Sequence, residues 1–231
     1  MDPDLTSHAW LPFLLQTADA LFPTGAYAHS LGFEEAVRLG VVRDEATLAE
    51  FLRLQIAPAQ EQLELPYLRY AFEAGGIDAL CALDREIDAW KLPAEARDAS
   101  AQLGGRRLAA LRKIADGDDL TAFATAIATG RARGHHLVVC ALQARAGAVP
   151  LHAALVTYFY QSLAAICAAA LKLIRIGQDG CQRVLRAAVA GVDAIVARSL
   201  TIERRDAGWF NPLLEIAAMR HARADERLFI S

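Results

Sequence analysis

Apolar side chains recur every three to four residues along most of the chain, which is the spacing of a helix face. The cleanest stripe stops before a proline and is formed by Ile77, Leu80, Leu83, Ile87 and Trp90. No segment of useful length alternates apolar and polar residues, and we find no hairpin signal. The pattern therefore predicts an all-α protein.

Turn and cap residues predict where the helices begin and end. Gly40 suits the left-handed position after a helix, and Asp44 suits the N-cap of the next one. Pro66 is expected to begin a further helix, which Gly75 and Gly76 end. From the same signals, further helices are expected over residues 94–115, 121–129, 137–146, 181–200 and 212 to about 227.

The spacing of these segments favours a single unit. The loops are short, and no internal repeat, low-complexity tract or linker rich in Ser and Pro interrupts the chain. We therefore expect one compact multi-helix bundle over residues 1–231.

One helix, expected over residues 150–175, is apolar enough to be weighed as a membrane span, because residues 153–171 carry no charge. Its polar residues and many alanines reduce the energy of membrane insertion. A helix that is apolar all round also suits the centre of a bundle. We expect the central helix of a bundle and no membrane contact.

Composition and charge exclude several classes. Hydrophobic residues make up 55% of the chain and charged residues 22%, and Ala and Leu are very common, which favours a folded helical protein. The formal net charge of -3 gives no sign of a nucleic-acid partner. Acidic residues stand where a secretory signal needs bases, so a cytoplasmic protein is expected. The four cysteines lack C-x-x-C spacing and are expected to be buried thiols.

Motifs for nucleotide and metal chemistry are weak. The chain has no P-loop pattern and no Gly-Lys pair, so it is not expected to hydrolyse a nucleotide itself. No two of the six histidines have i,i+4 spacing, and the adjacent His135 and His136 would point about 100° apart on a helix. We expect no preformed metal site and no cofactor of its own. A weak or transient nickel contact by His135, His136 or His221 is the alternative.

Other polar residues allow two interpretations each. Ser30 beside His29, or Cys140 near His136, could be a nucleophile, but Ser30 equally suits a helix N-cap. The arginines near turns, Arg106, Arg107, Arg204 and Arg205, are either ordinary solvated side chains or groups that pair with carboxylates of a partner.

Three stretches together resemble a known family. "LLQTADALFPTGAYAHSLGFEEAV" over residues 14–37 looks like the N-terminal signature of the urease accessory protein F (UreF) family. "LKLIRIGQDGCQRVL" over 171–185 and "PLLEIAAMRHARADERLFIS" over 212–231 are similar to its middle and its end, in the same order. The chain departs from the family pattern at Ala26, Arg223, Ala224 and Ile230.

The resemblance implies a non-enzymatic, all-helical, dimeric chaperone of urease maturation. It implies a scaffold that bridges UreD (also called UreH) and the nickel-carrying GTPase UreG, and that modulates GTP hydrolysis while nickel is inserted into apo-urease. A GTPase-activating protein with an arginine finger is the alternative, and an independent helical enzyme is a third interpretation.

The resemblance also suggests partner contacts at both ends of the chain. At the C-terminal end, residues 209–231 are the expected segment that docks onto UreD, because large apolar side chains near a terminus contribute little to a monomer. This segment could become ordered on binding. At the N-terminal corner, Tyr27 and His29 line a surface or channel wall, or they are satisfied core residues. The expected interface residues are Pro23, Thr24, Gly25, Tyr27, His29, Ser30, Glu34, Trp209, Phe210, Met219, His221, Arg227, Leu228 and Phe229.

Overall fold

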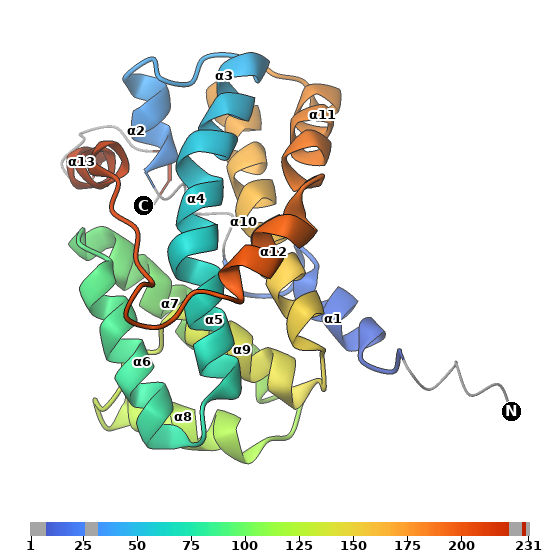
Figure 1. Cartoon of the computed structure of the whole chain (residues 1–231), viewed down its shortest axis with the longest axis vertical. Helices are drawn as coiled ribbons and strands as arrows, with labels where there is room; N and C mark the ends of the chain where they lie inside the picture. The colour runs from blue at the N-terminus through green and yellow to red at the C-terminus, as the bar shows by residue number, and fades with distance from the viewer. Residues whose placement is uncertain (1–7, 26–31, 222–227, 230–231) are drawn as a thin grey trace, which may run out of the picture.

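The computed structural model describes residues 8–25, 32–221 and 228–229, and every regular element within them is a helix (Figure 1). The all-α prediction is confirmed. The α-helices are α1 (Leu11–Ala18), α2 (Phe33–Arg38), α3 (Glu45–Phe51), α4 (Ala57–Ala59), α5 (Leu65–Glu73), α6 (Ile77–Trp90), α7 (Ala94–Leu111), α8 (Asp118–Ala128), α9 (His136–Ala146), α10 (Leu151–Leu173), α11 (Gln178–Val189), α12 (Val192–Ser199) and α13 (Pro212–His221).

Helices α3, α4 and α5 form one continuous rod that runs the height of the molecule (Figure 1). Asp44 caps its start as predicted: its side chain accepts from Thr47 N at 2.9 Å, and the Thr47 hydroxyl lies 3.0 Å from Asp44 N. Pro66 stands in the first turn of α5, as predicted, but α5 continues the rod without a break. The π-helical segments Leu52–Ile56 and Gln60–Glu64 come before Pro58 and Pro66, and their wider turns accommodate the proline rings.

Pro66 also fixes where a later part of the chain crosses this rod. A proline has no N–H, so the carbonyl of Gln62, four residues back, cannot accept the usual α-helical hydrogen bond. The backbone N–H of Gly208 donates to that oxygen at 2.9 Å. The Gln62 carbonyl, four residues before Pro66, is therefore an attachment point for a distant segment of the chain.

Helix α9 is the most completely enclosed element. Every residue from Leu137 to Ala144 is buried, against α5, α7 and their neighbours. Helix α7 comes close enough to the start of α9 that a Cβ on Gly104 would lie 2.8 Å from His136 N and would collide with the carbonyl oxygen of Gly134. Only glycine permits this approach.

The apolar helix α10 packs against α2, α5, α9, α11 and α12, which confirms the expected central helix. One face carries fully buried Leu155, Phe159 and Leu163, whereas Tyr160 on another face is 47% exposed. By length and composition alone α10 could cross a membrane, a test that core helices also pass.

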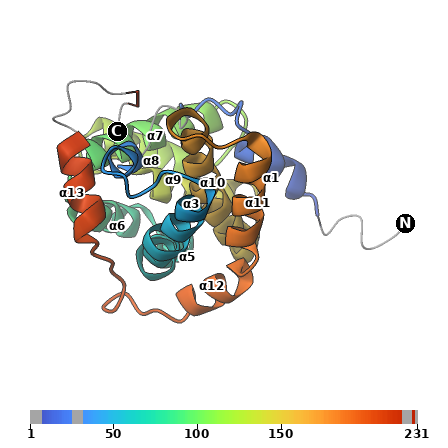
Figure 2. The ribbon, with the colours of Figure 1, turned by 90° about the horizontal axis from the view of Figure 1, so that it is seen from above.

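The C-terminal third departs from the expected helix over 181–200. Helix α11 ends at Val189 and α12 begins at Val192, because the turn at Ala190 and Gly191 redirects the chain so that α12 packs on both α10 and α5. Residues 200–211, here called the strap, then lead from α12 on one side of the bundle to α13 on the other (Figure 2).

The close approach of α7 and α9 predicts that alanine substitutions at two neighbouring glycines of α7 change the stability in opposite directions. Gly104→Ala should lower the free energy of unfolding by about 3 kcal/mol or more, because its methyl group meets backbone atoms that cannot move aside. Gly105→Ala, on the same helix with open space around it, should raise it by about 0.5–1 kcal/mol. Urea denaturation of both variants measures the difference, and equal effects would contradict this packing.

Candidate partner interface

Helix α13 is joined to α2 by a buried carboxylate. Glu35 is 1% exposed, and Arg38 Nε donates to its Oε2 at 2.6 Å. On the other oxygen, Arg220 Nε of α13 forms an ion pair with Oε1 at 2.9 Å. The hydrogen bond from Arg38, with further help from Arg220, holds the pKa of Glu35 below its ordinary value even though burial raises it. The carboxylate therefore stays charged and holds the two helices together.

A buried histidine at the end of α13 adds a third helix to this contact. His221 is 1% exposed. Its Nε2 lies 2.9 Å from Glu34 Oε2 on α2, and its Nδ1 lies 3.1 Å from Glu95 Oε2 on α7. Both ring nitrogens thus face carboxylate oxygens, and one side chain links α2, α7 and α13.

Glu34 also binds the C-terminal residues. The backbone N–H groups of Leu228 and Phe229 donate to its two oxygens at 2.8 and 3.1 Å. Phe229 is buried, and Lys172 Nζ lies 5.2 Å from the centre of its ring, whereas Leu228 is 60% exposed. Burial raises the pKa of Glu34, but the hydrogen bonds from Leu228, His221 and Phe229 outweigh it and leave the pKa below its ordinary value.

The strap is held across the α3–α5 rod mainly through its own backbone. The Arg69 guanidinium donates to the carbonyl oxygens of Leu200 and Ile202 at 2.8 and 2.6 Å. Tyr70 Oη donates to the same Ile202 oxygen at 2.7 Å. No sequence pattern marked Arg69 or Tyr70, because their acceptors are backbone carbonyls far along the chain.

The outward side of α13 and its approach is apolar. A row of side chains, here called the apolar row, is exposed to solvent at 61%, 37%, 54% and 45% for Phe210, Leu213, Ile216 and Met219 respectively. Phe210 and Met219 were predicted from the sequence as interface residues. Leu213 and Ile216 were missed, although they follow at the same spacing of three. Trp209, also predicted, is half-buried, and its indole Nε1 has no hydrogen-bond acceptor within the described residues.

The Pro23–Gly25 corner packs against α7. Pro23 is exposed and Thr24 is buried. Gly25 has a left-handed φ of 75°, and a Cβ there would collide with the guanidinium of Arg106. Helix α2 has Gly32 at its N-cap, in the place where Ser30 was considered. The predicted interface residues Tyr27, His29, Ser30 and Arg227 lie outside the described residues.

The structure thus brings together one part of the predicted interface. Glu34, His221, Leu228 and Phe229 meet at one place, with Glu95 as a member that the sequence did not reveal. Nothing in the pattern around Glu95 marked it, because it looks like an ordinary acidic residue in the first turn of a helix.

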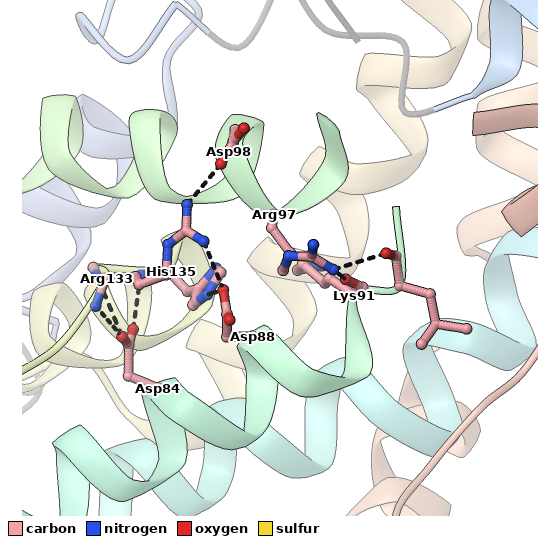
Figure 3. Close-up of polar contacts among 9 residues, drawn as sticks. Asp84, Asp88, Lys91, Arg97, Asp98, Arg133 and His135 are labelled. Atoms are coloured by element: carbon pink, nitrogen blue, oxygen red, sulfur yellow. Dashed lines mark hydrogen bonds and ion pairs between the residues drawn. The ribbon is translucent and has the colours of Figure 1, made fainter. Parts of the chain in front are cut away.

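A second buried polar cluster joins α6 to the loop before α9 (Figure 3). Asp84 has no exposed surface and accepts from the backbone N–H groups of Arg133, Gly134 and His135 at 2.6, 3.2 and 2.8 Å. Asp88, one turn on, lies 3.1 Å from His135 Nε2 and 3.3 Å from Arg133. This cluster fixes the loop against α6.

His135 is buried and His136 is half-buried. Burial lowers the pKa of His135, so the ring is held neutral, and its Nδ1 has no partner in the part of the chain that the structure describes. His136 Nε2 lies 3.0 Å from Arg107 Nε, which donates to it. Within the described ranges, no three His, Cys, Asp or Glu side chains are arranged to hold a metal ion.

The positions of Cys140 and Arg107 do not suit the roles considered from the sequence, a nucleophile and a surface arginine. Cys140 lies 3.5 Å from His136 Nε2, but that nitrogen already accepts from Arg107, and burial raises the pKa of the thiol. The thiol is therefore kept protonated. Arg107 is neither a solvated nor a surface recognition residue: it is buried and donates to Gln143 Oε1 at 2.5 Å.

The chain is similar to urease accessory proteins over most of its length. The UreF family model matches residues 42–189. A urease accessory protein UreF of Paenarthrobacter aurescens is 36% identical over 218 residues, which cover 94% of this chain and 96% of that protein. Proteins of the same name from Kocuria rhizophila and Haemophilus influenzae Rd are 30% and 31% identical, over 97% and 94% of this chain and 98% and 94% of their own lengths.

The lowered pKa of Glu34 predicts that the C-terminal residues are released in acid. The carboxylate stabilises their docking fully above its ordinary pKa of 4.5, and this stabilisation is lost as the pH falls through the lower value of the docked state. The protection of the Leu228 and Phe229 amides from hydrogen exchange should therefore collapse below about pH 4. In Glu34→Ala the protection should be low at every pH, and an unchanged profile would contradict the contact.

The Asp84 cluster predicts a large difference between two aspartates of α6. Asp84→Ala leaves three buried N–H groups without an acceptor and should cost about 3–5 kcal/mol of unfolding free energy. Asp78→Ala removes an exposed partner of Arg131 and should cost less than about 1 kcal/mol. Denaturant titrations measure both, and similar losses would show that the buried carboxylate has no special role.

Proposed function

Because the chain belongs to the UreF family of urease accessory proteins, we propose that it is a scaffold of urease maturation. In this proposal it bridges UreD (UreH) and the GTPase UreG, and it modulates GTP hydrolysis while nickel is passed to apo-urease. Nickel is the cargo of the complex. The protein itself performs no catalysis and works in the cytoplasm as a homodimer.

The observation that carries the proposal is the apolar row on α13. Its four side chains face solvent in the isolated chain, although a folded protein gains by burying such groups. The row is held in place by the Glu35–Arg220 pair and by His221, so it is presented on a fixed helix. A fixed apolar helix face beside the C-terminus is the kind of surface that a protein partner covers, and we assign it to UreD.

The exposed row predicts which variants lose the partner. Ile216→Glu places a charge at the centre of the row and should weaken binding of cognate UreD at least about 30-fold, because burying an unpaired charge is costly. Ile114→Glu is the matched control: Ile114 is 44% exposed just after the end of α7, compared with 54% for Ile216, and its change should leave binding within about twofold. Size exclusion with light scattering and titration calorimetry measure both.

The same experiment tests the bridge. Wild-type protein with UreD should co-elute with UreG once GTP and nickel are added, and Ile216→Glu should lose both steps. Light scattering on the protein alone reports the dimer. If UreD binds Ile216→Glu as tightly as wild type, the assignment of the row to UreD is wrong. If no partner binds the wild type at any step, the scaffold proposal fails.

A further inference from the structure

The two hydrogen-bond partners of His221 determine how many protons its ring must carry. Its two ring nitrogens lie 2.9 and 3.1 Å from oxygens of Glu34 and Glu95. A carboxylate accepts hydrogen bonds and donates none, whereas a neutral imidazole has one donor nitrogen and one acceptor. Only the doubly protonated ring can donate to both carboxylates. A neutral ring would place a lone pair against a carboxylate oxygen on one side.

The charged groups around this ring come from several elements. Helix α2 contributes Glu34, together with Glu35 and Arg38, which bind one another, and α13 contributes Arg220, which pairs with Glu35. Helix α7 contributes Glu95, and α10 contributes Lys172, which lies over the Phe229 ring. The C-terminal residues contribute backbone N–H groups to Glu34. Among the residues that the structure describes, the carboxylates in contact with the ring are those of Glu34 and Glu95.

We propose that the second proton on His221 controls the docking of α13, and we call this proton the latch. When it is present, α13 and the C-terminal residues are docked on α2 and α7. When it leaves, this docking weakens. This deepens the proposed function and rests on it for the partner, because α13 carries the apolar row assigned to UreD. Binding of the partner then weakens as the pH rises, since a loosened helix must be re-ordered before it can bind.

Glu95→Gln distinguishes a proton latch from simple packing. The amide that this change introduces is nearly the same size as the carboxylate but can donate an N–H to the unprotonated Nδ1 of His221. The neutral ring then donates from Nε2 to Glu34 and accepts at Nδ1, so the second proton is no longer needed. His221→Gln removes the titrating group altogether. His152→Gln is the control, because His152 pairs with Asp193 at 3.4 Å on the surface.

Hydrogen exchange of the α13 amides in the full chain gives the test, at about pH 6 and about pH 8, which brackets the range where histidines change charge. After correction for intrinsic exchange, protection in wild type and in His152→Gln should fall about tenfold at the higher pH, the loss expected for one charge-assisted hydrogen bond. Glu95→Gln should change less than about twofold. His221→Gln should show the lower protection at both pH values.

The outcomes separate the latch from the partner assignment. Equal protection of wild-type α13 at both pH values would overturn the latch, and so would a Glu95→Gln variant with the same pH dependence as wild type. If Glu95→Gln does not fold, His221→Gln decides: a pH dependence that persists in it overturns the latch. These measurements need no partner. If UreD does not bind the apolar row, the proposed function is therefore refuted, whereas the latch is unaffected.

Discussion

The placement of the C-terminal region depends on one partly buried carboxylate, that of Glu34, whose side chain is 15% exposed. Removing a carboxylate from water is costly unless donors replace the water molecules. Here the donors are the ring of His221 and the backbone N–H groups of Leu228 and Phe229, which lie almost 200 residues further along the chain. Once α2 is packed into the bundle, the requirement for donors at Glu34 fixes where Leu228 and Phe229 lie.

Helix α13 is the reverse of an ordinary surface helix. Its buried residues are Ala217 and His221, whereas Leu213, Ile216 and Met219 face solvent. Leu214 packs partly buried against the core, and charges and hydrogen bonds supply the rest of the attachment of α13 to the bundle. Its exposed apolar side chains form the surface that we propose a partner covers. An attachment of this kind has a definite geometry and responds to protonation, whereas an apolar contact would be indifferent to pH.

Local sequence signals predicted the helices well where neighbouring residues decide the outcome. The Asp44 cap, the end of α2 at Gly40 and the apolar stripe of α6 all depend on residues within a few positions of one another. Prediction failed where the answer lies far away in the chain. The position of Pro66 at the start of α5 was predicted, but no local pattern shows that the Gln62 carbonyl accepts a hydrogen bond from Gly208.

The candidate site follows the same rule. The family resemblance pointed to Glu34, His221 and the C-terminal residues, but it could not show that they meet. Glu95 and Arg69 carried no signal, because an acidic first turn and a single helical arginine are common features with many possible partners. Arg107 was misread for the opposite reason: arginine is usually solvated, and only the packing of α1, α7 and α9 reveals its buried acceptors.

The bond between Gly208 and Gln62 sets a limit on how far α13 can travel. Only four residue steps separate Gly208 from Pro212, and a fully extended chain covers at most about 3.6 Å per step. While Gly208 stays bound, the first residue of a detached α13 therefore remains within about 14 Å of this anchor. The helix behaves as a ligand on a short tether, so its return is an intramolecular step at a high effective concentration, whatever the concentration of the protein.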